Sequence, residues 1–278
     1  MNIFNFFRRK QPSKKESELS VEIDFSNSKS PGTQFKEQTG IDLGTEYVKL
    51  STACNENVCP MCAQFEGKIF LSTDAPKLPL CPSCSCIYEY YFKDDLPPNT
   101  KISNINDFVL PAKCTSLFYK HQEELYEEKD IHRKIQLCES DLKKLPEFME
   151  PYLSANFQAP AELACRDLLP QFYMQLGKWD KAEKAIRRCI DSNAYFPEDG
   201  SIELAEFESY KKIATETLSY ISQNPGCLQR NIYKKMGYEN EERELLKDFL
   251  RYSKLIKKVK YNNTNQLFCN AEEPTNQQ

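Results

Sequence analysis

The sequence has little glycine and no long apolar run. Eight glycines in 278 residues, together with 28% charged side chains, argue against an all-β sandwich with many tight turns and favour helices. No apolar run reaches the roughly 18 residues that a membrane-spanning helix needs. The first residues also lack the apolar stretch and small-residue cleavage site of a secretory signal. We therefore expect a cytoplasmic protein.

Charge and motifs exclude further classes. A net charge of −4 gives no overall attraction to nucleic acid or to an anionic membrane, so such binding needs a local patch. The sequence has no phosphate-binding glycine loop, no nucleophile elbow and no HExxH motif. Its two histidines, His121 and His132, lie in charge-rich helical sequence and are predicted to be solvated. We expect a non-enzymatic protein without a small-molecule substrate.

The two ends of the chain are polar. Residues 1–44 show no sustained periodicity, which predicts a disordered or loosely ordered lead, and residues 270–278 form a tail. The first residues combine Phe4, Phe6 and Phe7 with the basic Arg8 and Arg9, a pattern that can touch a membrane surface. A frayed terminus explains it more simply, and we expect no membrane contact.

A cysteine module spans residues 45–93. Six of the twelve cysteines fall between positions 54 and 86, and clustered cysteines in a reducing compartment are typically metal ligands. Cys59 and Cys62 form one CxxC pair and Cys81 and Cys84 another, with 18 residues between them. This spacing is that of a zinc ribbon, whose four thiolates hold Zn²⁺ tetrahedrally. The short runs 46–51, 67–72 and 87–92 are predicted strands.

Other interpretations of the module are weaker. A redox centre predicts a single CxxC in a βαβ unit, and iron–sulfur clusters use other spacings. Cys54 and Cys86 are surplus for one tetrahedral ion, and Cys86 is an alternate ligand that can replace Cys81 or Cys84. A closed site of four cysteines has no open position, so we expect one structural zinc ion and no metal catalysis. The six remaining cysteines are predicted to be small buried hydrophobes: Cys114, Cys138, Cys165, Cys189, Cys227 and Cys269.

The module also resembles a known family segment. A CPxC followed by a GK-containing strand, a proline-rich loop and a CxC closure is similar to the C-terminal cysteine segment of phage minor head, or head morphogenesis, proteins. The matching residues are Cys59, Cys62, Gly67, Lys68, Pro79, Cys84 and Cys86, with Cys81 where that family mostly has histidine. The resemblance covers about 40 of 278 residues and omits the family's preceding helical region. It implies a shared metal-stapled β module, and capsid assembly does not follow from it.

Residues 94–114 are predicted to be a linker and residues 115–200 a helical region. Two helical hairpins are expected, with turns at Lys129 and Gly177 and a bend at Pro170. The second hairpin resembles a tetratricopeptide repeat through Gly177, Trp179 and Ala182, with Ile186 and Cys189 at core positions. The turns lie 48 residues apart, whereas regular repeats are spaced by about 34. An unrelated helical bundle is the alternative.

Residues 201–269 resemble a winged helix. A long helix ends at Asn224–Pro225–Gly226, a short helix and a third helix follow, and residues 256–261 and 266–268 are predicted strands. In family members that bind DNA, the third helix enters the major groove.

The charge of this unit gives conflicting indications. The start of the third helix is acidic, with Glu239, Glu241, Glu242 and Glu244, and carboxylates are repelled by phosphates. Residues 228–268 nevertheless carry ten Lys or Arg against five Asp or Glu, a net charge of +5. The predicted nucleic-acid-binding residues are Lys254, Lys257, Lys258 and Lys260.

The sequence therefore predicts a mainly α protein with a zinc-stapled β module, a tetratricopeptide-like layer and a winged helix. Our first hypothesis is a regulator that binds nucleic acid through the winged helix and a protein partner through the helical layer. The alternatives are a protein-interaction adaptor and an accessory of phage head assembly.

Overall fold

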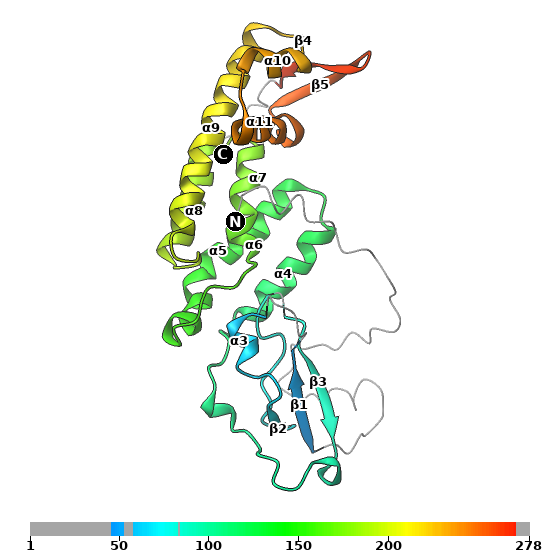
Figure 1. The fold of residues 1–278 in the computed structure, drawn as a ribbon, viewed down its shortest axis with the longest axis vertical. Coiled ribbons are helices and arrows are strands. Elements are labelled where there is room, and N and C mark those ends of the chain that lie inside the picture. Colours follow the sequence, from blue (N-terminus) through cyan, green and yellow to red (C-terminus); the bar gives the residue numbers. More distant parts are fainter. Residues whose placement is uncertain (1–45, 53–57, 83, 271–278) are drawn as a thin grey trace, which may run out of the picture.

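The structure is a computed structural model that describes residues 46–52, 58–82 and 84–270. The described part is mainly helical with a small β module, as the sequence predicted, and it contains two small antiparallel three-stranded sheets. Figure 1 shows one sheet at the lower end of the elongated molecule, the helices above it, and the second sheet at the upper end. Among the described helices, none combines the length and the apolar character that crossing a bilayer requires.

The first sheet has the order β2-β1-β3. Strands β1 (Tyr47–Ser51), β2 (Ile69–Leu71) and β3 (Ile87–Tyr91) lie in the three predicted runs. Side chains alternate between the faces of a strand, and this places Val48, Leu50 and Phe70 in the core, where each is 0% exposed. A short helix, α3 (Pro60–Ala63), precedes β2.

The segment after β3 packs back onto this sheet. It contains the short 3₁₀ helices η1 (Lys93–Asp95) and η2 (Ile105–Asp107). The Gln64 side chain donates to the Val109 carbonyl (2.7 Å) and accepts from the Val109 N–H (3.0 Å). The Phe108 ring stacks on Phe65 with centroids 4.9 Å apart. These contacts fix residues 103–109 against the cysteine module.

Helices fill the middle of the molecule. They are α4 (Thr115–Glu127), α5 (Ile131–Ser154), α6 (Ala164–Asp167), α7 (Leu169–Gln175) and α8 (Trp179–Asp191). Both predicted turns are present, and Gly177 has a φ of 70°, which favours glycine. The predicted bend at Pro170 is displaced, because the helix breaks at Leu168 and Pro170 lies in the first turn of α7. A missing N–H is tolerated there.

Helix α5 continues through Pro146 with help from a neighbour. A proline removes the hydrogen bond to the carbonyl four residues earlier, here that of Leu142. The Nε of Arg188 on α8 donates to this carbonyl at 3.1 Å. The interruption in α5 thus becomes a link between α5 and α8.

The C-terminal unit comprises α9 (Asp199–Gln223), β4 (Cys227–Leu228), α10 (Gln229–Met236), α11 (Asn240–Tyr252), β5 (Ile256–Tyr261) and β6 (Thr264–Cys269). The predicted order of helix, short helix, helix and hairpin is present. The two-residue strand β4 was not predicted, and it gives the sheet order β4-β6-β5. Apolar residues from all these helices and from the hairpin form its core: Phe207, Ile232, Leu246, Phe249, Ile256 and Leu267.

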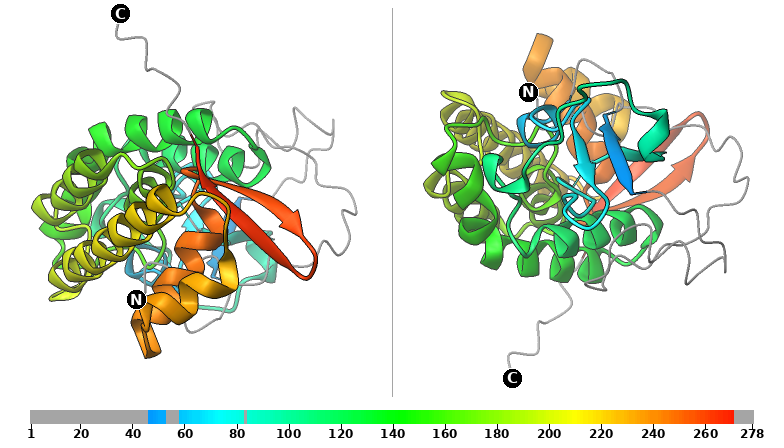
Figure 2. Two further views of the ribbon diagram at one scale, coloured as in Figure 1. Left: turned by 90° about the horizontal axis from the view of Figure 1, so that it is seen from above. Right: turned by 90° about the horizontal axis from the view of Figure 1, so that it is seen from below.

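The helical region and the C-terminal unit share one junction. The backbone N–H of Lys254 donates to the Gln175 carbonyl at 2.9 Å. Leu255 packs on Gly177 so closely that an added β-carbon would lie 2.9 Å from its Cδ1. The left view of Figure 2 shows the β5–β6 hairpin projecting from this junction, away from the helices.

Candidate metal centre and basic surface

Two tight turns present the cysteines of the module. Cys59 precedes α3, Pro60 occupies the first helical position, and the N–H of Cys62 donates to the Cys59 carbonyl at 2.9 Å. The second pair repeats this turn, with the N–H of Cys84 donating to the Cys81 carbonyl at 3.0 Å. The two CxxC pairs therefore share this backbone hydrogen bond between their cysteines.

The structure brings the two turns together. The sulfur of Cys62 lies 3.5 Å from that of Cys81 and 3.9 Å from that of Cys84. A tetrahedral ion with Zn–S bonds of about 2.3 Å separates its sulfurs by about 3.8 Å, whereas a disulfide needs about 2.05 Å. The cysteine cluster could thus hold a metal ion such as zinc.

Cys86 is the fifth member of the cluster. The sulfurs of Cys59, Cys62 and Cys81 lie within 4.8 Å of one another, and so do those of Cys62, Cys84 and Cys86. Cys62 belongs to both groups and lies at the centre. All five predicted ligands are therefore together, including the alternate one, and Cys54 lies outside the described residues.

The close thiols change one another's acidity. Hydrogen bonds from Cys62 and then Cys81 lower the pKa of the Cys59 thiol to about 3. Hydrogen bonds from the same two thiols lower the pKa of Cys84. The pKa of Cys62 is raised, chiefly because it donates to Cys59 and Cys81. The pKa values of Cys81 and Cys86 are raised as well, so only Cys59 and Cys84 are shifted toward the thiolate, which is the form that binds metal.

Tyr152 is a contact of the cluster that the sequence did not indicate. Its hydroxyl lies 3.6 Å from the Cys59 sulfur, although the two residues are 93 positions apart. Burial raises the pKa of Tyr152, so the phenol stays protonated and can donate to a thiolate. Tyr152 and Phe148 form an i, i+4 pair on α5, which from sequence reads as ordinary core.

The predicted basic residues do not form a single group. Lys254, Lys257, Lys258 and Lys260 are all exposed. Alternation along β5 places Lys258 and Lys260 on one face and Lys257 on the other. The three lysines of β5 thus divide between two sides of the hairpin, and Lys254 precedes the strand.

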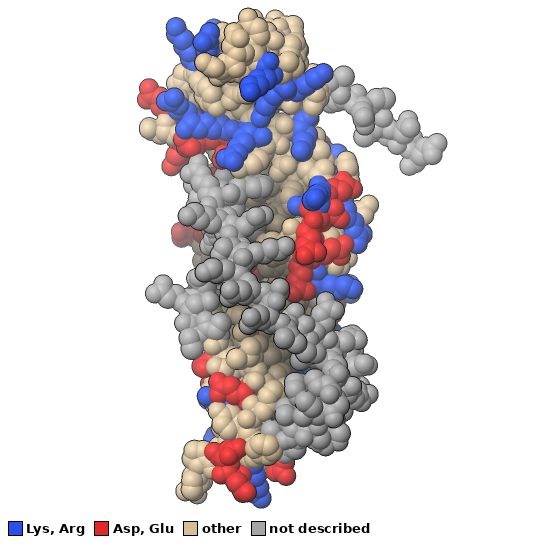
Figure 3. All heavy atoms as spheres, turned by 90° about the vertical axis from the view of Figure 1, so that its right-hand side faces the viewer, with Lys and Arg blue, Asp and Glu red and all other residues tan. Residues whose placement is uncertain are grey.

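Arg251 joins part of this group. Burial, then the nearby charges of Arg251 and Lys254, lower the pKa of Lys258, and its Nζ donates to the Arg251 carbonyl at 3.3 Å. We call Arg251, Lys254 and Lys258 the basic cluster. Among the described residues no carboxylate lies within ion-pair distance of these side chains. Figure 3 shows Lys and Arg side chains gathering at this end of the molecule.

The prediction for His121 was wrong. Its side chain is 12% exposed, and its Nδ1 lies 2.6 Å from Oδ1 of Asp141, which is 1% exposed. Burial raises the pKa of Asp141 to about 6, although His121 acts in the opposite direction. The charged neighbours of His121 in the sequence indicated a solvated position, whereas this side of α4 faces α5. His132 is exposed, as predicted.

Four of the six scattered cysteines are buried as predicted, namely Cys114, Cys138, Cys165 and Cys189. The prediction was wrong for Cys227, which is half-buried, and for Cys269, which is exposed on β6. Both lie on the small C-terminal sheet, which is too short to cover all of its side chains.

Comparison of the chain with protein-family models, curated proteins and solved structures gives no match.

Proposed function

We propose that this chain is a zinc-stapled, non-enzymatic regulator that binds duplex DNA through the phosphate backbone. The observation that carries the proposal is the basic cluster, in which three cations lie together without a carboxylate partner among the described residues. Such a group neutralises phosphates and releases counterions.

The C-terminal unit supports the proposal by its topology. The order α9, β4, α10, α11, β5 and β6, with the sheet order β4-β6-β5, is that expected of a winged helix. The β5–β6 hairpin is then the wing, and the basic cluster lies at its base, beside the C-terminal end of α11.

The mode of binding follows from the charges of α11. Its first turn carries the exposed carboxylates Glu241 and Glu242. Winged helices read bases by inserting the N-terminal end of this helix into a groove lined by phosphates. The carboxylates of α11 disfavour that insertion. We therefore propose contacts to the backbone from the basic cluster, with little dependence on base sequence and a strong dependence on salt.

The helical region is proposed to bind a protein partner. The α7–α8 hairpin has the features of a tetratricopeptide unit, since Gly177 forms the turn and Ala182, Ile186 and Cys189 are buried. With only two hairpins, α4–α5 and α7–α8, it forms a short layer without the long groove of a repeat array.

The cysteine cluster is proposed to hold one Zn²⁺ through Cys59, Cys62, Cys81 and Cys84. Four thiolates close the coordination sphere, so zinc bound there would stabilise the β module and activate no water. We expect about one ion per chain by elemental analysis, and its loss in C59S/C62S. An unchanged metal content in that variant would refute the ligand assignment.

The acidic turn of α11 favours a second function, a protein-interaction adaptor in which the winged helix is a docking surface. The resemblance to phage minor head proteins supports the metal module alone.

A DNA titration separates the regulator from the adaptor. Fluorescence anisotropy with a labelled duplex is measured for the full chain at several salt concentrations. The triple variant R251Q/K254Q/K258Q should bind more weakly, and the slope of log K against log salt should fall by about 2.7, or 0.9 for each lost phosphate contact. If the unsubstituted chain does not bind the duplex even at low salt, the regulator is refuted and the adaptor is the remaining proposal.

A charge-matched control distinguishes local from overall charge. Three exposed lysines outside the C-terminal unit are replaced by glutamine: Lys93, Lys101 and Lys120. This control should keep the slope of the unsubstituted chain. If it loses as much of the slope as the triple variant, binding reflects net charge and the basic cluster is not the site.

A further inference from the structure

The cysteine cluster has one thiol more than a tetrahedral ion requires. Resting on the zinc site proposed above, we propose that Cys86 is an exchange ligand. It takes the coordination position of Cys84 and makes the ion transferable to a thiol-rich or chelating acceptor. The observation behind this is that Cys84 and Cys86 both lie within 4.8 Å of the central Cys62 sulfur.

Burial divides the cluster into a fixed half and an accessible half. Cys59, Cys62 and Cys81 are only 8%, 3% and 1% exposed. Cys84 and Cys86, in contrast, are half-buried. Among the described residues, the side of Cys84 and Cys86 is therefore the more open one to an incoming ligand.

Neighbouring side chains also orient the buried half of the cluster. The Tyr152 hydroxyl contacts the Cys59 sulfur, and Gln64, one turn after Cys59, is bonded at both ends of its amide to Val109. Ligands that are oriented by neighbouring groups keep their geometry. Exchange at the opposite side thus need not disturb these three sulfurs.

The local chain geometry suits replacement of one sulfur by the other. Residues 84–86 run directly into β3, which begins at Ile87. The sulfurs of Cys84 and Cys86 lie within 4.8 Å of each other and of the Cys62 sulfur. The two thiols therefore face the same region and compete for one position.

The exchange step conserves ligands, protons and electrons. A bond forms between the Cys86 sulfur and the ion, and the bond to the Cys84 sulfur breaks. The Cys86 thiol gives its proton to water, and the released Cys84 thiolate takes one up. The ion keeps four sulfur ligands and no electron is transferred. Because one ligand is always available to replace another, an external acceptor can enter stepwise.

Metal content and release rate test the proposal. Zinc per chain is measured first, and release to a large excess of a coloured chelator is then followed for the zinc-loaded full chain. The C86S variant should keep one ion and release it more slowly, because the replacement ligand is absent. The C84S variant should also keep one ion, because Cys86 takes the vacant position. A C269S control, on an exposed cysteine of β6, should behave as the unsubstituted chain.

The outcomes are distinct. An unsubstituted chain without zinc refutes the zinc site itself. A chain that binds one ion but releases it at the same rate with and without Cys86 refutes exchange alone, and so does loss of the ion in C84S. Two ions per chain would also overturn exchange, since both groups of three sulfurs would then be occupied.

If the C84S variant folds poorly, a spectroscopic measurement on C86S tests the proposal in its place. The charge-transfer absorption of Co²⁺ bound to the unsubstituted chain and to C86S reports the number of thiolate ligands. Equal, four-thiolate spectra in both support Cys86 as a replaceable ligand. A three-thiolate spectrum in C86S would make Cys86 a permanent ligand and overturn the proposal.

Discussion

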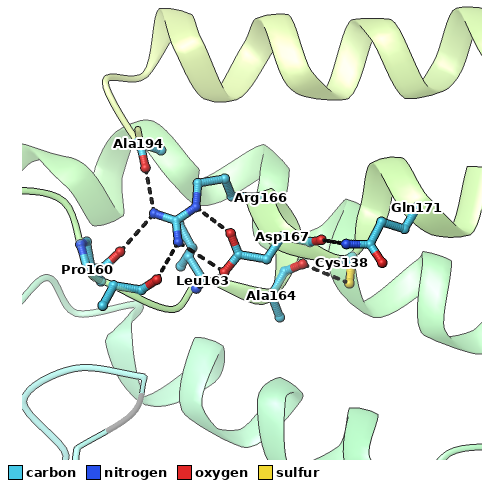
Figure 4. Close-up of polar contacts among 9 residues, drawn as sticks. Cys138, Pro160, Leu163, Ala164, Arg166, Asp167, Gln171 and Ala194 are labelled. Carbon is cyan, nitrogen blue, oxygen red and sulfur yellow. Dashed lines mark hydrogen bonds and ion pairs between the residues drawn. The ribbon is translucent and has the colours of Figure 1, made fainter. Parts of the chain in front are cut away.

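Replacement of Arg166 tests how the helices of the middle region are held together. Its side chain is 4% exposed on α6, yet it carries a full charge. The guanidinium donates to both carboxylate oxygens of Asp167 at 2.6 and 3.0 Å. It also donates to the carbonyls of Pro160, Ala161 and Ala194, each at 2.8 Å. Figure 4 shows this arrangement, in which one side chain joins the α5–α6 connection to the α8–α9 connection.

The expected cost follows from what R166M would leave behind. Methionine fills much of the volume but donates no hydrogen bond, so three carbonyls and the Asp167 carboxylate, 20% exposed, lose a donor. The N–H of Leu163 still donates to Asp167 at 2.8 Å, which compensates in part. Breaking a buried ion pair by removing one partner costs about 3–5 kcal/mol. We expect R166M to lower the free energy of unfolding by roughly that amount.

Urea denaturation monitored by circular dichroism measures this difference, and the chain offers a matched control. Arg187 on α8 pairs with Glu183 at 2.7 Å, but it is 59% exposed. Such i, i+4 surface pairs contribute about 0.3–0.5 kcal/mol, so R187M should change the midpoint little. Equal shifts in R166M and R187M would refute the role assigned to the buried network.

Three further predictions concern single side chains. Burial raises the pKa of Asp141 from 3.8 to about 6, so the folded state holds this proton more tightly. The stability that this protonated carboxyl contributes is lost as pH rises from about 4 to about 6. Over that range the free energy of unfolding of D141N should rise by about 3 kcal/mol relative to that of the unsubstituted chain. A constant difference between the two free energies across this pH range would contradict the prediction. Y152F should weaken zinc binding about 10-fold or more, because the hydroxyl contact with Cys59 is lost. Competition with a chelator measures the affinity, and an unchanged value would show that the contact is only packing. G177A should lower the free energy of unfolding by more than about 1 kcal/mol, because Gly177 has a φ of 70° and contacts Leu255. An unchanged free energy would mean that the turn adapts.

Features encoded over a few residues could be predicted from the sequence. The CxxC turns depend on four residues each, and the strands and helices on local alternation and periodicity, so their positions were predicted closely. The strand β4 was missed because two residues carry no period. The displaced bend at Leu168 shows that Pro170 marks the beginning of a helix as readily as a kink.

Features that depend on distant contacts could not be predicted. Arg166 and Asp167 read as an ordinary charged pair, and only the packing of α6 under the α8–α9 connection buries them. Tyr152 contacts the cysteine cluster across 93 positions of sequence. The approach of Lys258 to Arg251 depends on how the end of α11 meets β5, and the local charge count does not show it.

The two proposed sites contact the same helical region at different places. The cysteine cluster touches it through Tyr152, near the C-terminal end of α5. The basic cluster begins in the last turn of α11 and is tied to the C-terminal end of α7 by the bond from the Lys254 N–H to the Gln175 carbonyl. Substitutions at separated positions that share no partner are normally additive in free energy. Because Figure 1 shows the two sites toward opposite ends of the molecule, loss of the metal should leave the intrinsic DNA affinity of the folded C-terminal unit unchanged. A regulator built this way would need a partner on the helical layer to couple its two ends.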